Sequence, residues 1–245
     1  MIEPCLHAPP RLHLANGTLE ALKWLALLLM TGDHVNKYLF NETLPYLFEA
    51  GRVAMPLFVM VLGYNLARPG AFERGVHRRA AKRLFLFGLL ATPPFLALGG
   101  QWWGGWYPLN ILFALLVITL TAAACERAAA RQKHYWVVAL LVFTGGGALV
   151  EFWWPAVLLG LSTLWYVRRP NIMAALGVVV SFAGLSLING NSWAVAALPV
   201  LLLATRLPLK LPRWRWLFYA YYPLHLLALL LIRIPMAKAG YLFFI

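Results

Sequence analysis

Long apolar stretches separated by short polar connections run along almost the whole chain. A helix that crosses a bilayer needs about 20 mostly apolar residues, and several of these stretches come close to that length. Hydrophobic residues make up 62% of the sequence and charged residues only 12%, against about 25% charged residues in an ordinary soluble domain. The pattern predicts an all-α fold, a polytopic transmembrane helical bundle with about nine spans (roughly eight to ten). The predicted spans are 19–40, 53–67, 83–99, 109–125, 135–150, 152–167, 172–189, 193–205 and 216–232.

Positive charge alternates along the connections between these stretches. The net charge is +13, and every second connection is rich in Lys and Arg, whereas those at 100–108 and 189–192 have none. Basic loops of helical membrane proteins stay in the cytoplasm, so we predict a cytoplasmic amino terminus, with residues 1–18 as a tail and residues 19–245 as one transmembrane domain. Because the alternation accounts for most of the charge, no nucleic acid partner is expected. The basic connections are 68–83, 126–134, 168–170 and 206–215.

The first predicted span carries three ionisable side chains, Lys23, Asp33 and His34. Each such group at membrane depth costs roughly 2.5–3.5 kcal/mol on the scale measured from membrane insertion, which gives the lowest values. Ionisable residues in membrane spans are therefore rare and usually functional. On a helix, Lys23 and His34 lie within about 20° of each other and about 16 Å apart along the axis. Asp33 is rotated by about 100° from its neighbour. The span therefore predicts a functional stripe from a base near the cytoplasmic end to an acid–histidine pair in the outer half. The alternative for Lys23 alone is a snorkelling anchor.

Polar residues also interrupt three further predicted spans. Arg52 opens the second span, Asn110 opens the fourth, and His225 lies in the last, with Tyr222 three positions earlier on the same helix face. Arg52 is expected to pair with Asp33, since buried charges require partners, or to hold an anionic ligand group. A second histidine at bilayer depth predicts that the first and last spans converge. Neither the histidine spacing nor the cysteine content resembles a zinc site, so no metal is predicted.

Five landmarks spread in order over positions 23 to 226 resemble the TraX/TrbP family, the F-pilin acetylases of conjugative plasmids. The first-span pattern, a lysine followed after ten residues by a histidine, also resembles the acyltransferase-3 group of bacterial membrane acetyltransferases. The landmarks are Lys23 with Met30-x-x-Asp33-His34, Gly51-Arg52-x-x-x-Pro56-Leu57-Phe58, Arg79-x-x-x-Arg83-Leu84, Asn110-Ile-Leu-Phe113 and Tyr222-x-x-His225-Leu226.

The resemblance implies a multi-pass enzyme of the bacterial inner membrane that moves acetyl from cytosolic acetyl-CoA to the amino-terminal amine of a membrane-inserted pilin subunit. In the acyltransferase-3 group a first-span histidine is taken as catalytic, which corresponds to His34. Acetylating an amine with a thioester requires a base for the amine proton and a donor for the oxyanion. His34, oriented by Asp33, fits the base, and His225, Arg52 and Asn110 are the candidate oxyanion donors.

Coenzyme A carries phosphates and an extended arm, so its anionic end needs cationic protein at the cytosolic face. The roughly 16 Å between Lys23 and His34 is of the order that a pantetheine arm has to bridge. The rival interpretation of the arginines at 68–83 is that they only set the topology. The predicted donor-binding residues are Lys23, Arg78, Arg79, Arg83 and Tyr222.

Two other functions fit the same residues. One is an O-acetyltransferase that acts on a glycan or a lipid. The other is a proton-coupled membrane transporter in which Asp33, His34 and His225 form a relay. The sequence shows no duplicated halves of the kind that many secondary transporters have. Bound coenzyme A, or hydrolysis of acetyl-CoA, would favour either transferase over transport.

Overall fold

The computed structural model describes residues 10–99 and 106–241, and every regular element within them is a helix. The predicted all-α fold is therefore confirmed for this part of the chain. Of the predicted tail 1–18, residues 1–9 lie outside the described residues, and the first helix begins at Asn16. The elements are α1 (Asn16–Leu39), α2 (Pro45–Gly51), α3 (Ala54–Ala67), α4 (Val76–Leu98), α5 (Ile111–Ala129), α6 (Tyr135–Leu141), the π-helix η1 (Val142–Gly146), α7 (Gly147–Leu149), α8 (Trp153–Arg168), α9 (Ile172–Asn189), the 3-10 helix η2 (Trp193–Ala196), α10 (Ala197–Ala204) and α11 (Leu217–Lys238).

Each predicted span coincides with a helical region, but fewer regions are long and apolar enough to be candidate membrane spans. Among the described residues, five helical regions meet that requirement. α1 is long enough but carries Glu20, Lys23, Asp33 and Lys37, and α8 has only 16 residues. The regions Tyr135–Leu149 and Trp193–Ala204 are apolar but short. The five candidate spans are Pro45–Ala67, Val76–Leu98, Ile111–Ala129, Ile172–Asn189 and Leu217–Lys238.

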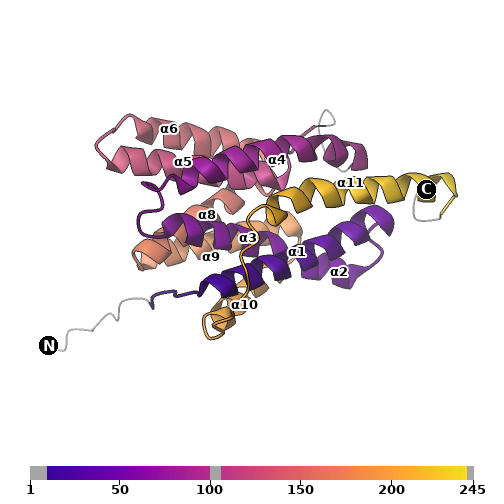
Figure 1. Ribbon diagram of the computed structural model, residues 1–245, viewed down its shortest axis with the longest axis horizontal. Coiled ribbons are helices and arrows are strands. Elements are labelled where there is room, and N and C mark those ends of the chain that lie inside the picture. Colours follow the sequence, from indigo (N-terminus) through magenta and orange to yellow (C-terminus); the bar gives the residue numbers. More distant parts are fainter. Residues whose placement is uncertain (1–9, 100–105, 242–245) are drawn as a thin grey trace.

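The long helices run side by side along the longest axis of the molecule (Figure 1). α11 packs against α4 and α1, α3 packs against α1 and α8, and α5 packs against α4 and α8. One apolar core surrounds Leu57, Ile118 and Leu159, and a second lies where Ala91 and Leu226 meet, between α4 and α11. The stripe of polar residues on α1 therefore faces the interior of the bundle, between these two cores.

The end of α1 turns back sharply into α2 and brings two charged residues together. The side-chain oxygen of Asn36, which is fully buried, accepts a hydrogen bond of 2.8 Å from the N–H of Leu44. Gly51 then packs directly on α1, where a Cβ atom would lie only 2.3 Å from the Cβ of Asp33. Only glycine permits this approach, and it places Arg52, the next residue, beside Asp33.

The connections before α5 and α8 lie side by side. Leu109 forms a parallel β-bridge with Val150, in which the Leu109 N–H donates to the Leu149 carbonyl and the Glu151 N–H donates to the Leu109 carbonyl. Phe152 and Trp153 follow with φ values of 61° and 47°. Two successive non-glycine residues in the left-handed region are uncommon and cost free energy. The surrounding structure therefore holds this turn, and Glu151 in it, in one defined position.

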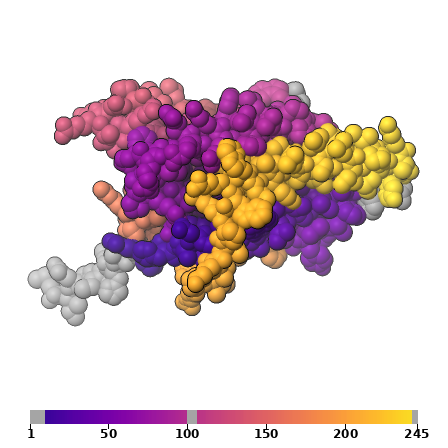
Figure 2. Space-filling model, viewed as in Figure 1, coloured from indigo at the N-terminus to yellow at the C-terminus, as the bar shows by residue number. Residues whose placement is uncertain are grey.

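The connection between α10 and α11 crosses the beginning of α1. The hydroxyl of Thr18 donates to the carbonyl of Leu207 at 2.5 Å and accepts from the N–H of Leu209 at 3.1 Å. Gly17 permits the contact, because a Cβ there would lie 2.1 Å from the Leu209 carbonyl oxygen. Figure 2 shows this connection on the surface, passing over α1. The crossing thereby brings Arg213 and Arg215, near the end of this connection, to a cavity beside α1.

Candidate active site

Two histidines from opposite ends of the chain meet inside the helical bundle. His34 lies on α1 and His225 on α11, and the His34 Nδ1 and His225 Nε2 atoms are 2.7 Å apart. The two rings are almost parallel, at 7°, with their centroids 5.0 Å apart. The predicted convergence of the first and last spans is therefore confirmed as a direct contact.

The hydrogen bonds of this pair fix which ring nitrogen is free. Nδ1 of His225 lies 3.0 Å from the carbonyl oxygen of Tyr221. A carbonyl oxygen only accepts, so Nδ1 of neutral His225 carries the proton and its Nε2 accepts. His34 must then donate from Nδ1, which leaves its lone pair on Nε2. The pair presents one free basic nitrogen, Nε2 of His34.

Asp33 and Arg52 form the ion pair that the sequence predicted. The Arg52 Nη2 and Asp33 Oδ2 atoms are 2.6 Å apart, and the side chains are 16% and 13% exposed. The Nε of Arg52 also donates to the Phe48 carbonyl at 3.2 Å. The expectation that Asp33 orients His34 is wrong for this structure. The two side chains diverge on α1, Asp33 points to Arg52, and His225 holds the imidazole.

The histidine cavity is a space of about 140 Å³ beside these two pairs, lined by Asp33, Arg52 and His34 but not by His225. It is bounded by α1, α2, α3, α5 and α11 and by the turn before α8. Apolar side chains, among them Phe48 and Met55, complete its walls. Its ionisable lining residues are Asp33, His34, Lys37, Tyr38, Glu42, Arg52, Glu151 and Tyr222.

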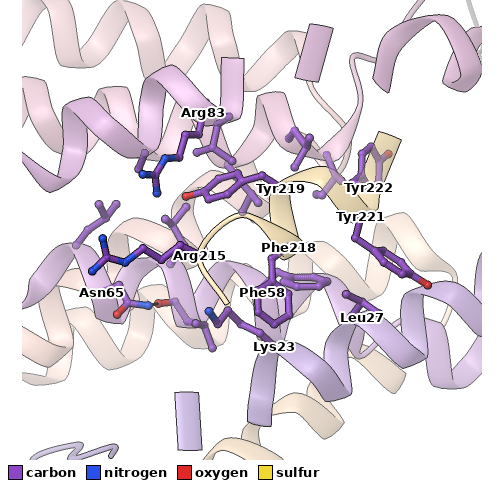
Figure 3. A pocket seen from close by; sticks show the side chains of 18 of the residues that line it. Lys23, Leu27, Phe58, Asn65, Arg83, Arg215, Phe218, Tyr219, Tyr221 and Tyr222 are labelled. Atoms are coloured by element: carbon purple, nitrogen blue, oxygen red, sulfur yellow. Dashed lines mark hydrogen bonds between the residues drawn. The ribbon is translucent and has the colours of Figure 1, made fainter. Parts of the chain in front are cut away.

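The basic cavity is a second space, of about 170 Å³, farther toward the beginning of α1. In Figure 3, Arg83, Arg215 and Asn65 stand on one side of it and Tyr221 and Tyr222 on the opposite side. Aromatic and aliphatic side chains line the space between them. Its cationic lining residues are Lys23, Arg83, Arg213 and Arg215.

The two cavities share one wall. Met30 of α1, Phe58 of α3, Ile111 of α5 and Tyr222 of α11 line both spaces. The Tyr222 and His34 ring centroids are 6.3 Å apart. A ligand long enough to fill the basic cavity would therefore place its far end beside the histidine pair.

Three of the predicted donor-binding residues line the basic cavity, and two do not. Lys23 and Tyr222 lie in its walls, as does Arg83, whose guanidinium stacks on the Trp216 ring at 4.3 Å. Arg78 and Arg79 are exposed and do not line the cavity, and Nη1 of Arg79 donates to the Arg74 carbonyl at 2.6 Å. The structure therefore does not bring these two arginines to the basic cavity, and their role in donor binding stays a prediction.

Asn110 has a structural role instead of the predicted oxyanion role. Its side-chain oxygen accepts from the N–H of Leu112 at 3.1 Å and so caps α5. Its amide nitrogen donates to the Gly88 carbonyl at 3.1 Å and to the Thr92 hydroxyl at 3.3 Å. With its polar atoms in use and the residue only 1% exposed, it has no group to offer a ligand.

The structure adds four charged residues that the sequence had not singled out as site residues. Arg213 and Arg215 enter the basic cavity because the preceding connection crosses α1. Lys37 lies one turn beyond Asp33 on α1, in the histidine cavity. Glu151 was visible in the sequence as a lone carboxylate between two apolar stretches, and that isolation was the available signal.

The described part of the chain contains no group of three or more His, Cys, Asp and Glu side chains arranged to hold a metal ion. A family model described as "TraX protein" matches residues 18–233. Two curated proteins named "Protein TraX", from Escherichia coli and from Escherichia coli strain K12, are 37% and 35% identical to this chain over 101 residues. Each match covers 41% of this chain and 37% of the relative. No solved structure matches.

Proposed function

The chain belongs to the TraX family, which is related to conjugative plasmid functions, and on that premise we propose that it is a membrane acetyltransferase. It moves an acetyl group from acetyl-CoA, bound in the basic cavity, to an amine in the histidine cavity. The acceptor is the amino-terminal amine of a conjugative pilin subunit in the bacterial inner membrane. The observation that carries this proposal is the His34–His225 pair, with one free basic nitrogen on His34, which lines the histidine cavity and lies 6.3 Å from the Tyr222 ring in the wall that the two cavities share.

In the proposed reaction, the neutral amine attacks the thioester carbonyl and Nε2 of His34 takes its proton. The C–N bond forms, the C–S bond breaks, and His34 returns the proton to the departing thiolate. His225 is a positioning residue, since it accepts from His34 Nδ1 while the Tyr221 carbonyl fixes its own tautomer. A correctly held general base of this kind typically contributes 10²–10⁴ in rate.

The oxyanion needs a hydrogen-bond donor beside the same wall. His225 uses its Nε2 as an acceptor from His34, and Asn110 caps α5, so neither is available. Arg52 keeps N–H groups beyond those bound to Asp33 and Phe48, and it lines the histidine cavity. Tyr222 lines both cavities. We therefore assign the oxyanion to Arg52 or to the Tyr222 hydroxyl.

The chemistry of the basic cavity supports binding of coenzyme A. Phosphates form charge-assisted hydrogen bonds with Arg and Lys, and Arg83, Arg213, Arg215 and Lys23 surround one side of the space. Lys23 is held by Glu20 at 2.7 Å and Arg213 lies 4.0 Å from the same carboxylate. The apolar remainder of the lining suits the uncharged pantetheine arm.

The proposed topology is a nine-pass bundle with a cytoplasmic amino terminus. It rests on the basic connections of the sequence, which lie at the same end of the bundle as the basic cavity. Coenzyme A would then enter from the cytosol. The histidine cavity lies toward the other end of α1, where an acceptor presented from the periplasm would meet it.

Replacing Arg83 and Arg215 together with glutamine should raise the KM for acetyl-CoA by at least about tenfold, because charge-assisted phosphate contacts are lost. The kcat at saturating donor should change little, since neither residue lines the histidine cavity. The matched control is Arg78→Gln with Arg79→Gln, which removes the same charge from exposed positions of α4. If the KM rises equally in both double variants, or rises in neither of them, Arg83 and Arg215 do not hold the donor.

The direct test of the proposed function is mass spectrometry of membrane proteins from cells with and without the gene. Acetylation of the pilin amino terminus only in cells that carry the gene is the expected result. Acetylated glycan or lipid with an unmodified pilin would assign the enzyme a hydroxyl acceptor. The absence of any acetylated product, together with no coenzyme A binding by the purified protein, would contradict acetyl transfer.

A further inference from the structure

Glu151 is a charged residue of the histidine cavity for which the reaction above has no role. The β-bridge between Leu109 and Val150 and the left-handed residues Phe152 and Trp153 hold its backbone in place. Its side chain lines the same cavity as His34. Asp33, by contrast, is already neutralised by Arg52 at 2.6 Å. Glu42 also lines the cavity, but it is exposed after the end of α1. Glu151 is therefore the carboxylate inside this cavity that carries no ion pair and can meet a ligand cation.

The surroundings of Glu151 make it a proton acceptor near neutral pH. Burial raises the pKa of the Glu151 carboxyl to about 7, and Lys37, the N–H of Ile111 and Arg52 offset only part of that rise. Asp33 raises it further. The titratable and charged groups that line the cavity around it are Asp33, His34, Lys37 and Tyr38 of α1, Glu42 after α1, Arg52 before α3 and Tyr222 of α11.

The proton balance of amine acetylation requires a second acceptor. An amine in water at neutral pH is mostly an ammonium ion, which has no lone pair for attack. It must lose one proton before attack and a second as the C–N bond forms. His34 takes the second and returns it to the thiolate, so the first must go elsewhere. A hydroxyl acceptor loses only one proton and needs no such group.

We propose that Glu151 binds the acceptor as its ammonium ion and takes the first proton, so that the histidine cavity selects primary amines over hydroxyl groups. This inference rests on the proposed acetyl transfer and names the acceptor class and the residue that recognises it. After transfer, Glu151 releases the proton to water. The overall change is acetyl-CoA plus ammonium to amide plus coenzyme A thiol plus one proton.

The test uses the full-length protein in lipid nanodiscs with acetyl-CoA and two probes. One is a short apolar peptide with a free α-amine, and the other is the same peptide with a hydroxyl in place of the amine. A free α-amine has a pKa of about 7.7–8.0, so it is mostly charged at pH 7 and mostly neutral at pH 9. About 9–17% of the amine is neutral at pH 7. Relative to the wild type at each pH, Glu151→Gln should therefore acetylate the amine probe about six- to elevenfold more slowly at pH 7 and within about threefold at pH 9.

The matched control is Glu49→Gln, a carboxylate of α2 that does not line the histidine cavity and should leave the rates unchanged. An equal deficit of Glu151→Gln at both pH values would show that Glu151 only supports the fold, and no deficit at pH 7 would also overturn the proposal. Acetylation of the hydroxyl probe as fast as the amine probe by the wild type at pH 7 would overturn the selectivity. A wild type that acetylates neither probe would instead overturn the acetyl transfer on which this inference rests.

Thermal unfolding gives a second, independent measurement. The folded-state pKa of Glu151, about 7, lies above the ordinary glutamate pKa of 4.5, so its contribution to stability is present below pH 4.5 and is lost as the pH rises through 7. At pH 8 the buried charge is a cost that glutamine removes. Glu151→Gln should therefore unfold at a temperature at least about 2 °C higher than the wild type at pH 8. A lower unfolding temperature would contradict the proposal, because it would show that the carboxylate stabilises the folded protein as the acceptor of the Ile111 N–H.

Discussion

Replacing His34 with alanine should lower the rate of acetyl transfer by about 10²–10⁴-fold, the usual cost of losing a general base. The free Nε2 of His34 is the one basic nitrogen that the histidine pair presents. In the variant Nε2 of His225 loses its partner, but His225 lines neither cavity, so it does not reach the acceptor in place of His34. The KM for acetyl-CoA should change little, since His34 does not line the basic cavity.

The measurement is transfer of radiolabelled acetyl to an amine probe at matched amounts of folded protein. His77→Ala is the matched control, because His77 is a buried histidine of α4 that lines neither cavity. A rate for His34→Ala within a few-fold of the wild type would eliminate His34 as the base. An equally large loss in His77→Ala would attribute the effect to a disturbed fold.

Replacing Asp33 with asparagine should destabilise the protein by about 2–4 kcal/mol. Removing one partner of a buried ion pair typically costs about 3–5 kcal/mol, because the other charge stays buried without compensation. The two side chains here are 16% and 13% exposed, so water partly solvates the remaining charge and the expected loss of stability is smaller. Activity per folded molecule should fall much less than in His34→Ala. The carboxylate of Asp33 bonds to Arg52, whereas the imidazole of His34 bonds to His225.

The double variant Asp33→Leu with Arg52→Met tests this explanation. Leucine has the branching of aspartate, and the two apolar side chains remove both charges together, so stability should recover to near that of the wild type. The measurement is chemical or thermal unfolding of the single and double variants in the same detergent. A double variant as unstable as Asp33→Asn would show that the side chains matter for packing and not for charge compensation.

The ends of several helices could be predicted from apolar length, and others could not. α1 and α9 begin and end within a few residues of the prediction because polar residues flank them on both sides. α4 begins at Val76 instead of 83, since Gly75 adopts φ 66° and the basic residues after it form exposed helical turns. The break between α7 and α8 could be predicted from Glu151, a lone carboxylate between two apolar stretches, but the left-handed conformation of Phe152 and Trp153 could not. This conformation depends on tertiary contacts with Leu109, which lie beyond any local pattern.

Some contacts of the candidate site could likewise be predicted from the sequence, and others could not. Asp33–Arg52 and His34–His225 could be predicted because an isolated polar group at membrane depth requires a partner. Asn110 obeys the same logic, but its partner is the backbone at the start of α5, as expected of asparagine at a helix N-cap. Arg213 and Arg215 reach the basic cavity only because a distant connection crosses α1, and no periodicity encodes that crossing.

The crossing of α1 by the connection before α11 also determines when the site can form during synthesis of the protein. Thr18 and its partner Leu207 are 189 residues apart, and a bacterial or eukaryotic ribosome adds about 5–20 residues per second, so roughly 10–40 seconds separate their appearance. During this interval α1 carries Lys23, Asp33 and His34 without the arginines of the crossing connection and without His225. The histidine pair and the cationic lining of the basic cavity can therefore form only after the last helix and the connection before it have been synthesised.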